Sequence, residues 1–220
     1  MSDTTIVTTL VSSGGTLLVS VVTLITNAFI ERFRAKLEIQ KKESQSKIEH
    51  LDDIYKELIS IINLYPDVSP NDILEYVDYA PNYSQEDFDL ILHTLDYQIE
   101  DYKEQLNNAN INYERKSNVD TQIYNREYAK KRISEIRDEY YMARDRYKSF
   151  CKSDKVVFEL YAGQDVRNCL VEFEVIIHNV FISGRKAGDK DDPINNMIQV
   201  SRRNLINSMR RDIKINLLKQ

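Results

Sequence analysis

The side chains that most often carry out chemistry in proteins are few in this sequence and widely spaced. The three histidines are His50, His93 and His178. Glu174 precedes His178 by one helical turn, and Asp89 precedes His93 by the same interval. Carboxylate-bridged di-metal bundles instead use Glu-x-x-His on two helices, with the histidine three residues after the glutamate. This spacing argues against a metal centre, and we expect no cofactor.

Motifs of the common enzyme classes are also missing. The sequence has no Gly-x-x-x-x-Gly-Lys loop to hold phosphates and no Gly-x-Ser-x-Gly nucleophile turn. The two cysteines, Cys151 and Cys169, form no redox or metal motif, and we expect both to be reduced thiols in the core or at its boundary. The sequence is therefore more typical of a protein that binds than of an enzyme.

The segment from Thr4 to Ile30 carries no ionisable side chain. A helix of this length would reach about 40 Å, whereas the hydrocarbon core of a bilayer is about 30 Å thick. A cleaved signal peptide would begin with basic residues, but here they follow the segment, at Arg32, Arg34, Lys36, Lys41 and Lys42. Because such flanks stay on the cytoplasmic side, residues 1–30 predict a tail and a single membrane span with the N-terminus outside. The alternative is a buried core helix.

Small polar residues recur along one side of this predicted span. They are Thr8, Ser12, Gly15, Thr16, Ser20, Thr23 and Asn27. Lipid tails are as apolar as leucine, so these side chains gain nothing from facing lipid, whereas a second helix can approach them closely and exchange hydrogen bonds. We therefore expect a homo-oligomer that assembles through the span within the lipid bilayer. The alternatives are hydroxyls that bond back to their own helix, or assembled spans that line a conducting pathway.

The remaining chain has the apolar periodicity of helices. Only five glycines and four prolines occur in 220 residues, too few for an all-β protein with many tight turns. Residues 31–47 are basic and polar, and they predict a helical stalk next to the membrane. Residues 48–220 predict a cytoplasmic antiparallel bundle of four or five long helices joined by short breaks. The predicted fold class is all-α.

Capping residues and prolines predict where these helices begin and end. The expected starts are Ser69-Pro70, the SQED stretch from Ser84 to Asp87, Asp120 and Pro193, and a break is expected around Ser153. The segment after that break is the most apolar part of the bundle. It also carries apolar residues on its other side, at Val171, Val175 and Ile182. We therefore expect this helix to be packed from several directions.

Charge is unevenly distributed, although the net charge is only −5. Acidic residues dominate from Glu49 to Glu104, and the end of the chain is basic. The basic residues there include Arg202, Arg203, Arg210, Arg211 and Lys214. We favour the interpretation that they pack across the acidic helices of the same bundle. The alternative is contact with an anionic membrane surface or a nucleic acid, and the acidic balance of the whole chain disfavours nucleic acid.

The uncharged span, the stretch ERFRAKLEIQKKESQSKIEHLDDIYKELISII and the closing LINSMRRDIKIN together resemble a loose group of uncharacterised bacterial single-span proteins. In that group a basic, Lys-Glu-rich helix follows the span, and the end is often Met/Ile-Arg-Lys/Arg-Asp-Leu-Gly. This sequence has Ile213-Lys214 where Leu-Gly would be usual. The resemblance implies the architecture and brings no activity or catalytic residues.

Together these features predict a membrane-anchored interaction or sensing module that holds a cytoplasmic protein partner. The tyrosines Tyr76, Tyr79, Tyr83 and Tyr97 lie either at the edge of the core or on a surface for such a partner. The second hypothesis is an oligomeric effector whose spans disturb the membrane, as a toxin or a defence protein would. An enzyme with an unrecognised site is the third and least favoured class.

Overall fold

The computed structural model describes the backbone of residues 3–107 and 112–218. Among these it describes all side chains except those of residues 3–26, 28, 43–44, 47–48 and 215–218. The chain divides into two compact units, one that ends at Glu49 and one of His50–Leu218. We call the second unit the bundle. The regular elements of the described residues are all helices, which confirms the predicted all-α class.

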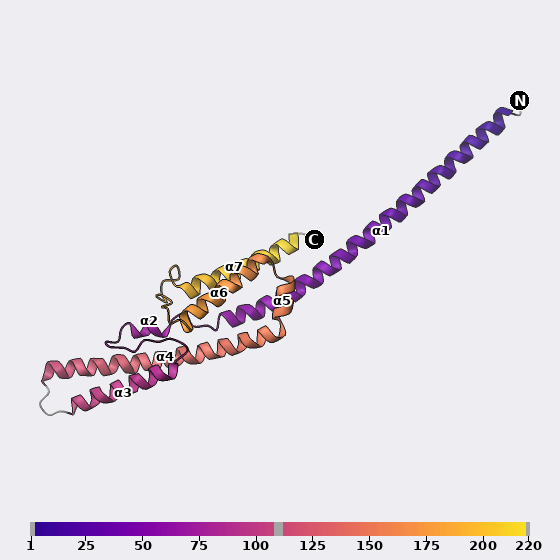
Figure 1. Cartoon of the computed structure of the whole chain (residues 1–220). Coiled ribbons are helices and arrows are strands. Elements are labelled where there is room, and N and C mark those ends of the chain that lie inside the picture. Colours follow the sequence, from indigo (N-terminus) through magenta and orange to yellow (C-terminus); the bar gives the residue numbers. More distant parts are fainter. Residues whose placement is uncertain (1–2, 108–111, 219–220) are drawn as a thin grey trace. The chain divides into compact units, whose positions relative to one another are not determined.

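Helix α1 (Asp3–Ile62) contributes its last turns to the bundle. The other helices are α2 (Pro70–Leu74), α3 (Phe88–Leu106), α4 (Tyr113–Ser153), α5 (Lys155–Tyr161), α6 (Gln164–Phe181) and α7 (Met197–Leu218). Helix α3 lies antiparallel to the first half of α4, and α6 lies antiparallel to α7 (Figure 1). The end of α1 and the helices α3, α4, α6 and α7 form the body of the bundle, and the short helices α2 and α5 connect them.

Aromatic rings fill the centre of the bundle. The ring of Tyr140 on α4 stacks on Phe181 of α6 with 4.4 Å between centroids, and it also meets Phe88 of α3 at 5.9 Å. The Tyr140 hydroxyl donates a hydrogen bond to Glu86, whose carboxylate pairs with Arg144 at 2.9 Å. A large aromatic ring can meet several helices at once, so one side chain of α4 ties α3 and α6 together.

The predicted start at Ser69-Pro70 is confirmed. Ser69 accepts a hydrogen bond from the Asp72 N–H, and the Asp72 carboxylate accepts one from the Ser69 N–H, which is a complete capping box. Helix α4 ends at Ser153, where a break was expected. A further break at Ala162 and Gly163 separates α5 from α6.

Two predicted starts are wrong. Asp120 lies inside α4, because Asn112 caps that helix earlier by accepting a hydrogen bond from the Arg115 N–H at 2.8 Å. Pro193 lies in the loop before α7, which begins at Met197. One of the first free N–H groups of α7 is satisfied by the buried Asn196 side chain, which accepts from the Gln199 N–H at 3.0 Å.

The SQED stretch is only partly a helix start. Helix α3 begins at Phe88, after Gln85 and Glu86 with φ of 57° and 61°. This left-handed conformation is uncommon for residues other than glycine. Here it lets the Gln85 N–H donate to the Ile182 carbonyl at 2.8 Å and aims the Glu86 side chain at Tyr140. A tertiary contact therefore overrides the local capping preference.

Tyrosines are divided between the core and the surface of the bundle. Tyr83 is fully buried, whereas Tyr76, Tyr79 and Tyr97 are exposed. Burial raises the pKa of five core tyrosines well above the ordinary value for this side chain: Tyr55, Tyr65, Tyr83, Tyr140 and Tyr147. Hydrogen bonds to carboxylates raise the pKa further for three of them, Tyr55, Tyr140 and Tyr147.

These raised pKa values predict loss of the bundle in alkaline solution. Above about pH 10 the tyrosines of the unfolded chain lose their protons while the buried ones keep theirs, so the free energy of unfolding falls as the pH rises. All fourteen tyrosines lie between Tyr55 and Tyr161, so tyrosinate absorbance reports on the bundle. The five buried tyrosines should ionise only together with the loss of helical circular dichroism. Ionisation of all fourteen near pH 10 with the helices intact would contradict this packing.

Candidate functional site

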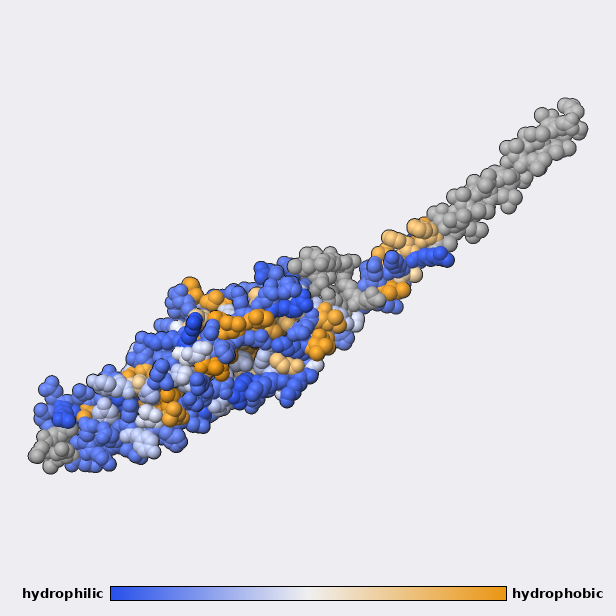
Figure 2. Space-filling view, viewed as in Figure 1, coloured by the Kyte–Doolittle hydropathy of each residue, from blue (hydrophilic) through white to orange (hydrophobic). Residues whose placement is uncertain are grey.

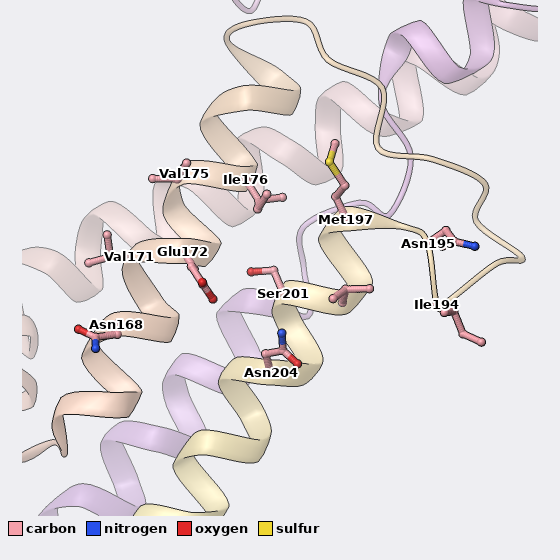
Figure 3. Close-up of a pocket in the computed structure, with 11 residues that line it drawn as sticks. Asn168, Val171, Glu172, Val175, Ile176, Ile194, Asn195, Met197, Ser201 and Asn204 are labelled. Carbon is pink, nitrogen blue, oxygen red and sulfur yellow. The ribbon is translucent and has the colours of Figure 1, made fainter.

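A groove of about 770 Å³ lies between α6 and α7 (Figure 3). Its α6 wall consists of Asn168, Val171, Glu172, Val175 and Ile176, its α7 wall consists of Met197, Val200, Ser201 and Asn204, and the preceding loop adds Ile194 and Asn195. The positions on each helix recur at three- or four-residue steps, so each wall is a single stripe of its helix. The volume is within the range of ligand-binding clefts.

Apolar side chains are exposed in this groove. Val171 and Val175, one turn apart on α6, are 56% and 50% exposed, and Ile194 is 75% exposed. The opposite face of α6 is buried in the core through residues such as Phe173 and Val180. Helix α6 therefore has two apolar faces, and the described residues cover only one of them. The expectation that this helix is packed from several directions is wrong for the face that carries the two valines.

The Ser201 hydroxyl faces the groove from α7. Ser201 is only 8% exposed, and its Oγ has no hydrogen-bond partner among the described residues. Buried hydroxyls nearly always have a partner, as Ser208 does two turns farther along α7, where Oγ donates to the Leu205 carbonyl at 2.7 Å. Figure 3 shows the Ser201 oxygen pointing toward α6. The hydroxyl is thus an unused donor and acceptor beneath the surface of the groove wall.

Glu172 is the one ionisable side chain that lines the groove. It is exposed, it makes no ion pair with the described residues, and its carboxylate points toward the α7 wall (Figure 3). The other polar groups of the lining are three amides and the Ser201 hydroxyl. This set holds no nucleophile paired with a base, and carboxylate, amide and hydroxyl groups around aliphatic side chains suit binding. The arrangement can take up an apolar surface that carries one cation.

Polar contacts on the other sides of α7 hold this helix in place. Arg202 donates to the Ile62 and Tyr65 carbonyls at 3.0 and 2.7 Å and pairs with Asp67 at 2.6 Å. Farther along α7, Asp212 accepts a hydrogen bond from the Tyr55 hydroxyl at 2.6 Å. These contacts attach α7 to the end of α1 and to the segment that follows it.

Asp212 also determines the junction between α5 and α6. It accepts a hydrogen bond from the Gly163 N–H at 3.1 Å. A Cβ atom at position 163 would lie 2.4 Å from the Asp212 Oδ1 atom, so any larger residue would displace this carboxylate. Gly163 is the residue that precedes α6, and this contact therefore fixes where α6 starts relative to α7.

The basic residues predicted as one contact face of the last helix point in different directions. Arg202 is turned inward, and Arg203 donates to the Pro193 carbonyl at 3.1 Å. Arg210, Arg211 and Lys214 are exposed. Two of the five acids of α3 are paired by α4, through Lys130 with Asp96 and Arg137 with Asp89. Arg202 pairs with Asp67, which lies in the loop between α1 and α2 and not on an acidic helix. The packing of the basic residues across the acidic helices therefore stays a prediction.

The predicted span stripe belongs to α1, but most of its side chains lie outside the described residues. These are Thr8, Ser12, Gly15, Thr16, Ser20 and Thr23, whereas Asn27 is described and is exposed. Where side chains are described, no helix is long and apolar enough to cross a membrane. The juxtamembrane basic residues Arg32, Arg34, Lys36, Lys41 and Lys42 are all exposed on α1.

Sequence reasoning missed the groove, although one signal for it was present. Val171 and Val175 lie opposite the main apolar stripe of α6, which periodicity detects. What periodicity cannot tell is whether a second apolar face is covered by the same chain, because that depends on where α7 lies. The position of α7 follows from Arg202 and Asp212, which are polar residues that a hydrophobic pattern does not weigh.

Replacing Ser201 by alanine tests whether its hydroxyl is unused. Ser201→Ala should leave the free energy of unfolding unchanged or raise it by up to about 1 kcal/mol, because no hydrogen bond is lost. The matched control Ser208→Ala removes a buried hydrogen bond and should lower the free energy of unfolding by about 1 kcal/mol. Urea unfolding followed by the near-ultraviolet dichroism of the tyrosines measures both variants. Equal destabilisation would mean that Ser201 already has a partner in the folded chain.

No family model matches this chain, and no curated protein and no solved structure is significantly similar to it. The resemblance to bacterial single-span proteins therefore stays a prediction.

Proposed function

We propose that this protein is a membrane-anchored interaction module whose bundle binds a helix of a protein partner in the groove between α6 and α7. The observation that carries the proposal is the uncovered apolar face of α6 opposite the unpartnered Ser201 hydroxyl. Amphipathic helices commonly bind by laying an apolar face into a groove of this kind, with anchors three or four residues apart.

The dimensions of the groove favour a helix as the occupant. The α6 wall extends from Asn168 to Ile176, a rise of about 12 Å or two helical turns. Two aliphatic side chains one turn apart on the partner would contact Val171 and Val175, which have the same spacing. A lysine or arginine beside them would pair with Glu172. The proposed partner segment is therefore a short amphipathic helix with one basic residue next to its apolar stripe.

The membrane anchor is the second part of the proposal. It is supported by the uncharged segment from Thr4 to Ile30 and by the basic residues that follow it. The small polar residues of that segment support self-association through the span. In this arrangement a partner bound by the bundle would be held at the cytoplasmic face of the membrane, and two or more copies would be brought together.

Peptide binding tests the groove. The probe is a fluorescent, helix-stabilised peptide with leucines four residues apart and an adjacent arginine, compared with the same peptide carrying glutamate there. The full chain in mild detergent should bind the arginine peptide about tenfold more tightly, equivalent to about 1.4 kcal/mol, by fluorescence anisotropy. Glu172→Arg should reverse this preference, and Val175→Asp should weaken the binding of both peptides.

Leu90→Asp is the matched control, because Leu90 is 62% exposed on α3 and does not line the groove. It should leave both affinities unchanged. Equal binding of the two peptides to the natural chain, or an effect of Leu90→Asp as large as that of Val175→Asp, would contradict a specific helix-binding groove.

Self-association through the span is tested by the mass of the full chain in mild detergent. Thr16→Leu with Ser20→Leu should convert a defined oligomer into a monomer, because leucine prevents close approach of the helices. Val21→Leu, on the other side of the predicted span, should leave the oligomer intact. An unchanged oligomer in the double variant would show that the small polar residues are not the contact surface.

A further inference from the structure

The described part of α1 carries exposed apolar side chains at the end of the predicted span and in the first turns after it. Phe29 is 71% exposed, Ile30 40%, Phe33 57% and Leu37 45%. Figure 2 shows hydrophobic and hydrophilic side chains next to each other on this part of the helix. Two exposed phenylalanines, one on each side of Glu31 and Arg32, are unusual for a helix surrounded by water. We call these four residues the aromatic stripe.

The aromatic stripe occupies one sector of the helix. Successive residues of an α-helix are rotated by about 100°, so Phe29, Phe33, Leu37 and Ile30 fall within about 100° of one another in that order. The next residue in register, Gln40, is polar. The stripe is therefore about two turns long and ends before the bundle begins at His50.

The charges are arranged around this sector by sign. Lys36 and Arg32 lie along one edge of the aromatic stripe, and Arg34 and Lys41 lie along the other edge. Glu31 and Glu38 lie on the opposite side of the helix, where Lys42 is the one cation among residues 29–42. All seven side chains are exposed. Cations on both borders of an apolar stripe, with acids on the far side, are typical of helices that lie at a membrane surface.

We propose that residues 29–42 form an interfacial element that inserts the aromatic stripe into the headgroup region of an anionic lipid surface. The bordering lysines and arginines would reach phosphate groups on both sides while their aliphatic stems cover apolar surface. The inference rests on the proposed membrane anchor, and it adds a second membrane contact with its own lipid chemistry.

Geometry determines what the interfacial element does to α1. From Phe29 to Leu37 the helix rises about 12 Å, whereas the polar layer of one leaflet is only about 5–8 Å thick. A helix perpendicular to the membrane would therefore leave Leu37 in water. Immersing the whole aromatic stripe requires this part of α1 to tilt toward the membrane surface, with the stripe facing the lipid. The lipid contact thus sets the direction in which the helix leaves the membrane.

A single tryptophan tests the immersion, because the natural sequence contains none. Phe33→Trp is prepared in the full chain and reconstituted into vesicles of phosphatidylglycerol and phosphatidylcholine, some with brominated acyl chains. Its emission should shift to shorter wavelength, and the brominated lipid should quench it about twofold or more. The matched control Ile39→Trp replaces a 58% exposed residue outside the stripe and should stay accessible to a water-soluble quencher.

Charge is tested with Arg32→Gln combined with Lys36→Gln. In the Phe33→Trp chain, these two substitutions should reduce the quenching of the tryptophan by brominated lipid in anionic vesicles. In vesicles of phosphatidylcholine alone, the quenching should be equally low with and without the two substitutions. Equal quenching in anionic and neutral vesicles would overturn the requirement for anionic lipid.

Flotation of the Phe33→Trp chain with the vesicles separates the two proposals. If the chain floats but brominated lipid does not quench its tryptophan, the proposed anchor stands and the interfacial element is overturned. A blue-shifted tryptophan that lipid does not quench assigns the aromatic stripe to a second copy of the chain, which also overturns it. A chain that does not float overturns the anchor, and the interfacial element with it.

Discussion

A helix with two apolar faces needs cover on both, and α6 is such a helix. Its inner face, with Phe173, Ile177 and Val180, is completed by the aromatic core around Tyr140. Its outer face carries Val171 and Val175, and the described chain supplies no helix to cover them. Water in contact with this face is unfavourable by about 25 cal/mol for each Å² of apolar surface. The free energy that burial of the face would release is therefore available to a partner.

The groove stays open because polar contacts hold α7 away from the outer face. Arg202 is bound to two backbone carbonyls and to Asp67, and Asp212 is bound to Tyr55 and to the Gly163 N–H. Moving α7 to cover the valines would break these half-buried contacts, and each one left without a partner would cost about 1–3 kcal/mol. The bundle thus keeps a preformed groove, and a preformed groove loses little conformational entropy when a partner binds.

The sequence predicts the parts of this fold that depend on local or periodic information. The all-α class follows from few glycines and prolines, and the helix start at Ser69 follows from a capping box that needs only neighbouring residues. Predictions failed where a distant contact decides. Gln85 and Glu86 take left-handed backbone conformations that suit Ile182 and Tyr140. The groove belongs to the second group, since it exists only through the position of α7.

Photo-crosslinking from inside the groove tests the central claim most directly. A photoreactive phenylalanine at Val175 of the full chain, activated in the cells that produce the protein, should give one discrete adduct with another protein. The crosslinked peptide should be an amphipathic helix with a basic residue, and Glu172→Arg should abolish the adduct unless that basic residue is changed to glutamate. The same group at Leu90 should give no such adduct. If Val175 yields no adduct, or one that Glu172→Arg does not affect, the groove is not where this protein holds a partner.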